Sequence, residues 1–264
     1  MGDMTLVSVP PRLDAKPDWG DRTLPTTKQP PRFGPRLLRV LTTVIGCAGL
    51  AWGIFNAPRG EAADDFRELE SRLLQFETFS QTTAIGALAS ALAWNVSPCD
   101  NHAQRALLLM EIPLADAALR SGSARDYDER VRSLESRARE ALACTPRDSF
   151  IWLVLFGLET GHGVLDQRAF DLLAMSYETS PNEAWIATRR ITLAIPVVFS
   201  APAPVQERVL NEFQGLVNNG FVELPARAYL RASTATRKLL QSRIELLDAS
   251  QKRAFSEALQ KQRA

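Results

Sequence analysis

The sequence predicts an all-α protein in which a single transmembrane helix precedes a TPR-like, α-solenoid-like soluble domain of helical hairpins. Residues 40–58 contain no charged side chain, which is typical of a membrane-spanning segment. After them, apolar residues recur at spacings of three and four, the period of helices with one buried face. Short runs of glycine, proline, serine and asparagine separate these periodic segments, as expected for turns between helices.

Composition excludes several functional classes. The chain has 31 lysines and arginines against 30 aspartates and glutamates, so it lacks the basic excess of a nucleic-acid-binding protein. Two histidines and three cysteines in 264 residues restrict metal and acid–base chemistry. We therefore expect no nucleic-acid partner and no cofactor.

Residues 1–36 form the first predicted region, a cytoplasmic arm. Seven of the 16 prolines lie in its first 35 positions, and large apolar residues are scarce. Such a segment buries too little surface to offset the entropy of ordering it, so we expect disorder. The cluster Pro30, Pro31 and Pro35 is either a polyproline docking site or a plain spacer.

Residues 37–56 are the expected transmembrane helix, since a bilayer core requires about 20 residues. Arg39 can extend its charged group to the interface, and Trp52 and Phe55 lie where an aromatic belt would place them. The alternative is a cleavable signal peptide cut near residues 60–62. The charged segment before the apolar run is longer than an ordinary signal peptide has, which favours a retained anchor.

The charges around this segment predict its direction. Lys28, Arg32, Arg36 and Arg39 precede it, whereas acidic residues outnumber Arg59 after it. Basic residues stay on the cytoplasmic side of a membrane. We therefore expect a single-pass protein of the bacterial inner membrane, with a cytoplasmic N-terminus and a periplasmic C-terminal domain.

Small residues share one face of the expected span. Thr42, Gly46, Gly49 and Gly53 follow one another at steps of four, three and four. Such a face lets two helices approach closely in lipid, which predicts self-association or packing on a partner's helix. The alternative is that glycine is simply common in membrane helices.

Residues 57–98 are predicted to form juxtamembrane helices. Phe66, Leu69, Leu73 and Phe76 define an amphipathic helix over 62–80. That helix either forms a short coiled coil or packs on its own domain. An alanine-rich helix over 82–95 is expected next, with small side chains suited to close helix contact.

Residues 99–200 are the predicted helical-hairpin region. A first arm over 101–120, interrupted or kinked at Pro113, turns at residues 121–123 into a second arm over 125–143. Antiparallel arms of similar length bring Cys99 and Cys144 to the same end, where an oxidising compartment would join them. The alternative is two unpaired thiols in a cytosolic protein.

The chain resembles the tetratricopeptide repeats over about Arg125 to Ile195. Helices are expected from residue 149 to the Gly161-His162-Gly163 turn, over 165–178, and from about residue 183. The residues that carry the resemblance are Gly157, Ala169, Ser176 and Pro181, with Ala141 and Pro146 repeating the end of such a unit. The resemblance implies stacked helical hairpins with a groove for a protein or peptide.

Residues 201–264 are predicted to form the C-terminal helices. The amphipathic run that includes Val205, Val209 and Phe213 stops at Asn218-Asn219-Gly220, a strong helix terminator. Basic residues recur along the last two helices. They form either an ordinary solvated face or a contact with an anionic lipid or glycan surface.

No catalytic or metal-binding motif is present. The glycines of the Gly161-His162-Gly163 turn follow a predicted helix, and Asp166 replaces the third glycine of a dinucleotide site. His102 and His162 lack neighbouring ligands at metal-site spacings. The sequence contains no HExxH, P-loop or GxSxG pattern.

These observations predict a non-catalytic, membrane-anchored periplasmic scaffold that binds another protein of a cell-envelope system. The layout resembles the accessory membrane proteins of bacterial polysaccharide assembly and export, which implies a place in such a system. The alternative is a periplasmic enzyme that acts on envelope glycans or peptides through residues brought together only by folding.

Overall fold

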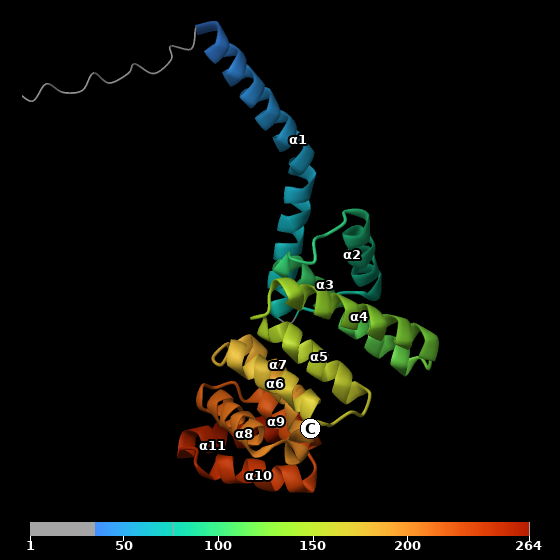
Figure 1. The fold of residues 1–264 in the computed structure, drawn as a ribbon. Coiled ribbons are helices and arrows are strands. Elements are labelled where there is room, and N and C mark those ends of the chain that lie inside the picture. The colour runs from blue at the N-terminus through green and yellow to red at the C-terminus, as the bar shows by residue number, and fades with distance from the viewer. Residues whose placement is uncertain (1–34, 76, 264) are drawn as a thin grey trace, which may run out of the picture. The chain divides into compact units, whose positions relative to one another are not determined.

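The computed structural model describes residues 35–75 and 77–263. For residues 35, 36 and 54–64 it describes the backbone alone. The predicted arm therefore lies outside the described residues, apart from Pro35 and Arg36. Every regular element in the described ranges is a helix, as expected for the all-α class (Figure 1). The elements are α1 (Pro35–Leu74), α2 (Gln81–Ala93), α3 (Asn101–Arg120), α4 (Ala124–Cys144), α5 (Ser149–Gly161), α6 (Gln167–Thr179), α7 (Ala184–Ala194), the 3-10 helix η1 (Ile195–Ser200), α8 (Ala203–Asn218), α9 (Glu223–Arg231), α10 (Thr234–Glu245) and α11 (Ala249–Arg263).

The prediction of a transmembrane helix over 37–56 is wrong. Within the described ranges, no helix combines the length and the apolar character that crossing a membrane requires. The predicted single-pass orientation depended on that span, whereas the periplasmic location of the C-terminal domain stays a prediction.

Residues 1–54 and 55–264 form two separate units. In the first unit, the described part of α1 exposes apolar side chains such as Leu41, Ile45 and Leu50. Thr42 donates its hydroxyl hydrogen to backbone carbonyl oxygens one turn earlier in the helix. The expected packing face of Thr42, Gly46, Gly49 and Gly53 opens onto free space, because a Cβ on any of these glycines would meet no atom within 4 Å.

The second unit begins with the end of α1, which packs on its own domain. Phe66 and Leu73 are buried against α2 and α3, together with Leu88, Leu107 and other small or aliphatic side chains. This contact accounts for the amphipathic period of the segment without a coiled coil. Ser80 caps α2 by accepting a hydrogen bond from the backbone N–H of Thr83 at 3.1 Å.

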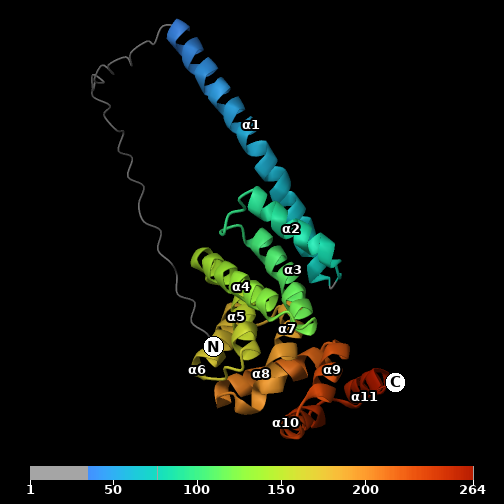
Figure 2. The same ribbon diagram turned by 90° about the vertical axis from the view of Figure 1, so that its right-hand side faces the viewer.

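Helices α3 and α4 form the expected hairpin and lie side by side in both views (Figures 1 and 2). Asp100 caps α3, and Gly122 makes the turn with a φ of 74°, a left-handed conformation that favours glycine. The expected break at Pro113 is wrong, because α3 runs through that residue to Arg120. The kink that the same proline could cause stays a prediction.

Helices α5, α6 and α7 follow as a packed set. Asp148 and Asp166 cap α5 and α6 by accepting backbone N–H hydrogen bonds. Gly157 lets α5 approach α7 closely, because a Cβ there would lie 3.3 Å from the Leu193 side chain. Buried aromatic and aliphatic residues, including Phe156, join these helices to the largest core of the unit.

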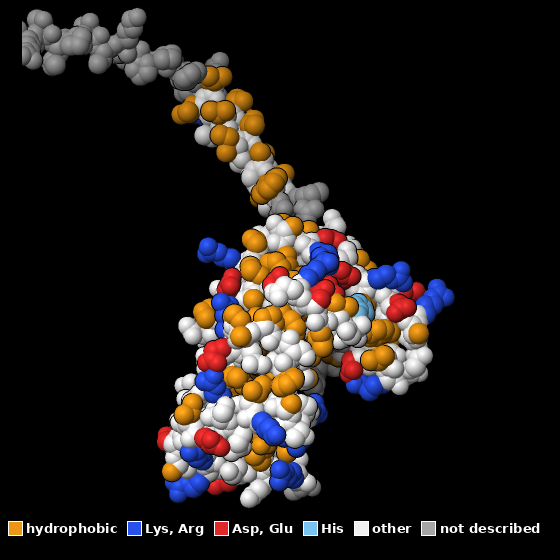
Figure 3. All heavy atoms as spheres, turned by 60° about the horizontal axis from the view of Figure 1, so that its bottom comes forward, with side chains coloured by type: hydrophobic (Ala, Val, Ile, Leu, Met, Phe, Trp, Pro, Cys, Tyr) orange, Lys and Arg blue, Asp and Glu red, His pale blue; other side chains and the backbone are white. Residues whose placement is uncertain are grey.

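That core is completed by η1 and α8–α11. Phe255 on α11 meets Phe213 on α8 and Tyr229 on α9, each ring pair at about 5.8–5.9 Å in an edge-to-face arrangement. Aromatic side chains bury large apolar areas, so this contact ties the last helix to the rest of the unit. On the face drawn in Figure 3, charges of both signs are interspersed with apolar side chains.

Candidate functional site

The second unit contains a groove of about 910 Å³, which we call the α8 groove. One wall is the outer face of α8, including Arg208, Asn211 and Asn219. The opposite wall is the end of α6 and the turn that leads into α7. The α-helices α6, α7 and α8 therefore build it, and no single segment contains its lining.

Tyr177 and Glu212 line the groove and belong to a buried network centred on Arg190. The Arg190 guanidinium is fully buried and donates from Nε and Nη2 to Glu212 Oε1 at 2.9 and 2.6 Å. Its Nη1 donates to the carbonyl oxygens of Ser176 and Ser180 at 2.9 and 3.0 Å. Tyr177 donates its hydroxyl to Glu212 Oε2 at 2.9 Å, so both carboxylate oxygens are engaged.

Burial governs the titration of this network. It raises the pKa of the Glu212 carboxyl above its usual range, against the hydrogen bonds and charge of Arg190 and the Tyr177 hydrogen bond. Burial, reinforced by the charge of Glu212, raises the pKa of Tyr177 well above its ordinary value of 10.0. A raised carboxyl pKa is typical of a general acid, but a general acid needs a substrate within hydrogen-bond reach. Glu212 is instead the fixed partner of Arg190.

The upper walls of the groove are polar but internally paired. Arg208 contacts Glu178 at 3.5 Å, and both side chains are about half exposed. Asn211 accepts a hydrogen bond from Arg243 at its side-chain oxygen, 3.1 Å away. Asn219 donates its side-chain amide to the carbonyl oxygen of Gly215 at 2.7 Å.

The middle of the α8 groove is apolar and open. Ala187 and Leu216 are buried along its floor. A Cβ on Gly215 would meet no atom within 4 Å, so there is free space above the helix backbone at that position. Phe221, which is 47% exposed, stands at the end of the groove.

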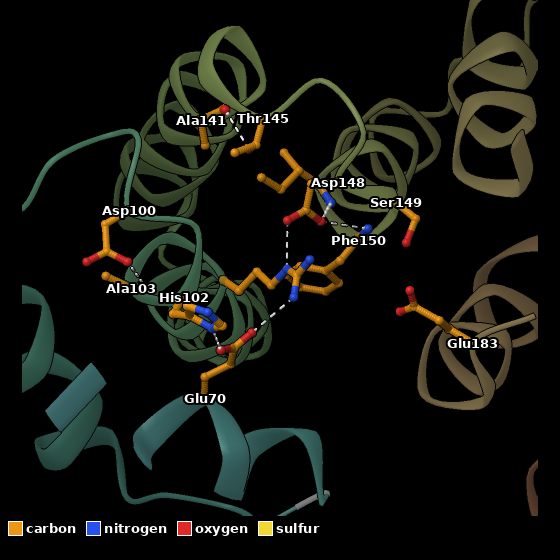
Figure 4. A network of polar contacts seen from close by, with 12 residues as sticks. Glu70, Asp100, His102, Ala103, Ala141, Thr145, Asp148, Ser149, Phe150 and Glu183 are labelled. Carbon is orange, nitrogen blue, oxygen red and sulfur yellow. Dashed lines mark hydrogen bonds and ion pairs between the residues drawn. The ribbon is translucent and has the colours of Figure 1, made fainter. Parts of the chain in front are cut away.

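A second polar network joins α1, α3 and α5. Arg105 donates to Asp148 Oδ2 at 2.6 Å and to Glu70 Oε1 at 3.3 Å. Both carboxylates are almost fully buried and point toward the guanidinium from opposite sides (Figure 4). His102 pairs with the other oxygen of Glu70, and Arg105 also lies over the ring of Trp185.

The electrostatics of this second network indicate a structural role. Burial raises the pKa of Asp148, opposed by Arg105 and by the backbone N–H groups of Ile151 and Phe150. Burial also acts to lower the pKa of Arg105, but Asp148 and Glu70 outweigh it and the pKa is raised. The charged groups of Arg105, Asp148 and Glu70 therefore pair with one another where α1, α3 and α5 meet.

The structure joins Cys99 to Cys144 in a disulfide, with Cα atoms 5.1 Å apart. The bond links the loop before α3 to the last residue of α4; Asp100, the cap of α3, follows Cys99 directly, and Asp148, the cap of α5, follows Cys144 by four positions. His102 belongs to the second network, whereas His162 forms the end of α5. The described ranges hold no group of three or more histidine, cysteine or acidic side chains placed to bind a metal ion.

Arg190 and the groove beside it were not predicted from the sequence. One signal was present: Arg190 lies on the same helical face as Ile186, Ala187, Ile191 and Ala194, where a charge must find a buried partner. Its partner Glu212 is 22 positions away on a different helix, and no local pattern identifies it.

Comparisons with known proteins add no relative. No family model matches the chain, and neither a curated protein nor a solved structure shows significant similarity to it.

Proposed function

We propose that this chain is a non-catalytic scaffold that holds another protein of a cell-envelope system through the α8 groove. The observation that carries the proposal is the groove itself, an open apolar floor between polar walls whose charged side chains are already paired. Such a surface supplies contact area and hydrogen bonds, and it leaves no acid or base free for a reaction.

The disulfide supports the envelope location. Disulfides persist in secreted and periplasmic proteins and are rare in the cytosol, where thiols are kept reduced. Cys99 and Cys144 are both exposed at the surface, so a reducing compartment would open the bond readily. An oxidising compartment is therefore the setting in which this junction is stable.

Site-specific photo-crosslinking in cells tests the scaffold. A benzophenone amino acid at Asn182 or Phe221, on the exposed rim of the groove, should yield one discrete covalent adduct whose partner mass spectrometry identifies. Gly215→Trp should abolish the adduct by filling the groove, whereas Gly215→Ala should keep it. The same benzophenone placed at the exposed Ser136 on α4 is the control position.

The result that overturns the proposal is the absence of any adduct from both rim positions in cells that contain the folded chain. An adduct that persists unchanged in Gly215→Trp would also overturn it, because the partner would then be held elsewhere. Alkylation of intact cells tests the location separately: free Cys99 and Cys144 in most molecules would contradict an oxidising compartment.

A further inference from the structure

We infer that the occupant of the α8 groove is an uncharged, extended polypeptide segment with one apolar side chain at its centre. This inference rests on the proposed function and specifies the chemistry of the partner. It follows from the charge of the groove, from the placement of its amide groups and from the open space at Gly215.

The charges of the groove favour an uncharged occupant. Glu212 is neutralised by Arg190, and Glu178 faces Arg208 across the groove edge. A charged ligand would lose water on entering and would find no unpaired counter-charge, so its desolvation would be uncompensated. A neutral segment avoids that cost.

The amide groups of α8 suit a peptide backbone. Within the described part of the chain, Asn211 uses its side-chain oxygen with Arg243, which leaves its N–H donors available. Asn219 uses its N–H with Gly215, which leaves its side-chain oxygen as an acceptor. An extended backbone presents both carbonyl oxygens and N–H groups along its edges, so it can meet one donor and one acceptor in line.

The spacing of these two amides sets the length of the segment. Asn211 on α8 and Asn219, its C-cap, are eight positions apart, which is roughly 12 Å at 1.5 Å per residue. An extended chain covers about 3.3 Å per residue, so about four residues span the distance and a pentapeptide fills it.

The open space between the two amides suits an apolar side chain. Gly215 lies midway between Asn211 and Asn219, above a floor that includes Leu216 and Ala187. In an extended segment, alternate side chains point the same way, so one central side chain reaches the floor while its neighbours face solvent. A glycan fits less well, because hydroxyl groups turned toward an apolar floor would lose their hydrogen bonds to water.

Saturation-transfer NMR on the full-length chain tests the inference with four probes. They are three terminally blocked pentapeptides and maltopentaose. The first peptide, Ser-Thr-Leu-Thr-Ser, is uncharged, and the other two replace both serines with glutamate or with lysine. We expect saturation of the leucine methyl groups in the uncharged peptide and at least about tenfold weaker binding of each charged peptide and of maltopentaose.

Substitutions locate that binding in the groove. Gly215→Trp should abolish it, and Gly215→Ala should preserve it because a methyl group has room there. Gly86→Trp, at an exposed glycine of α2 with open space around it, is the matched control and should bind as the unmodified chain does. Asn211→Ala with Asn219→Ala should weaken binding about tenfold, a second measurement that stands if Gly215→Trp unfolds.

Three results overturn the inference: no saturation of the uncharged peptide, preference for a charged peptide or maltopentaose, or binding that survives both the Gly215→Trp and the double asparagine variants. These results separate it from the proposed function. If crosslinking in cells yields an adduct that Gly215→Trp removes while the peptide fails to bind, the scaffold stands and the extended-peptide occupant is wrong.

Discussion

Arg105 and Arg190 each join three segments of the second unit, but their side chains differ in exposure to solvent. The Arg105 side chain is 21% exposed and bridges carboxylates from α1 and α5. The Arg190 side chain has no exposed area, and it pairs with one carboxylate and two backbone carbonyl oxygens. An arginine that keeps some water tolerates the loss of a partner better than one that is fully enclosed.

The two networks also differ in their surroundings. The Cys99–Cys144 disulfide links the loop before α3, the helix that carries Arg105, to the end of α4. Arg190 has no covalent bond beside it and depends on the core of α6, α7 and α8 for its position. The stability of the groove thus depends on noncovalent contacts alone, which makes it the more sensitive of the two regions to single substitutions.

Glu212→Gln should have the largest effect. It leaves the Arg190 charge buried without its counter-charge, which costs about 3–5 kcal/mol of unfolding free energy. Urea denaturation measures the change. The control is Glu178→Gln, which removes the half-exposed pair with Arg208 and should cost at most about 1 kcal/mol.

A double variant separates the cost of an unpaired buried charge from the cost of altered side-chain packing. Replacing the pair by Arg190→Met with Glu212→Leu should recover much of the stability that Glu212→Gln loses, because no unpaired charge remains. Equal losses in Glu212→Gln and Glu178→Gln would show that burial of Arg190 has no energetic consequence.

Asp148→Ala should have a smaller effect, about 2–3 kcal/mol. It removes the cap of α5, with its backbone bonds to Phe150 and Ile151, and also the 2.6 Å contact with Arg105. Asp166→Ala is the matched control, since it removes a cap of α6 without an ion pair and should cost about 1 kcal/mol. Equal losses of unfolding free energy in the two variants, measured by urea denaturation, would contradict a contribution of the Arg105–Asp148 contact to stability.

The smallest expected effect is the contribution of Tyr177 to the fall in unfolding free energy at alkaline pH. The pKa of Tyr177 is raised in the folded chain, so above pH 10 the unfolded chain loses this proton while the folded chain keeps it. Stability should therefore fall by about 1.4 kcal/mol per pH unit from this group, beginning near pH 10. Tyr177→Phe should lack that part of the decline at a cost of about 1 kcal/mol at neutral pH.

Chemical denaturation of both proteins between pH 9 and pH 11 measures the difference in slope. Spectrophotometric titration at alkaline pH is the accompanying control, because the tyrosine missing from Tyr177→Phe should be the last to ionise. Parallel slopes would contradict the burial of Tyr177 against Glu212.

Much of the fold was predictable because its signals are local. The bounds of α3 and α4 follow from an apolar period, the Ser121-Gly122-Ser123 turn and the Asp100 cap. Two arms of similar length then place Cys99 beside Cys144. No break occurs at Pro113, because the burial of Leu114, Met110 and their neighbours together offsets the ~3 kcal/mol by which proline disfavours a helix interior.

The sequence by itself determined the helices, their turns and the near-neutral charge of this chain, because each depends on residues close together or on composition alone. Tertiary structure alone decided the Arg190–Glu212 pair, the meeting of Glu70 with Asp148 at Arg105, and the α8 groove. Those features depend on which helices pack together, and packing is set by the shapes of many distant side chains at once. A pattern within one helix identifies the face that needs a partner, but the fold supplies the partner.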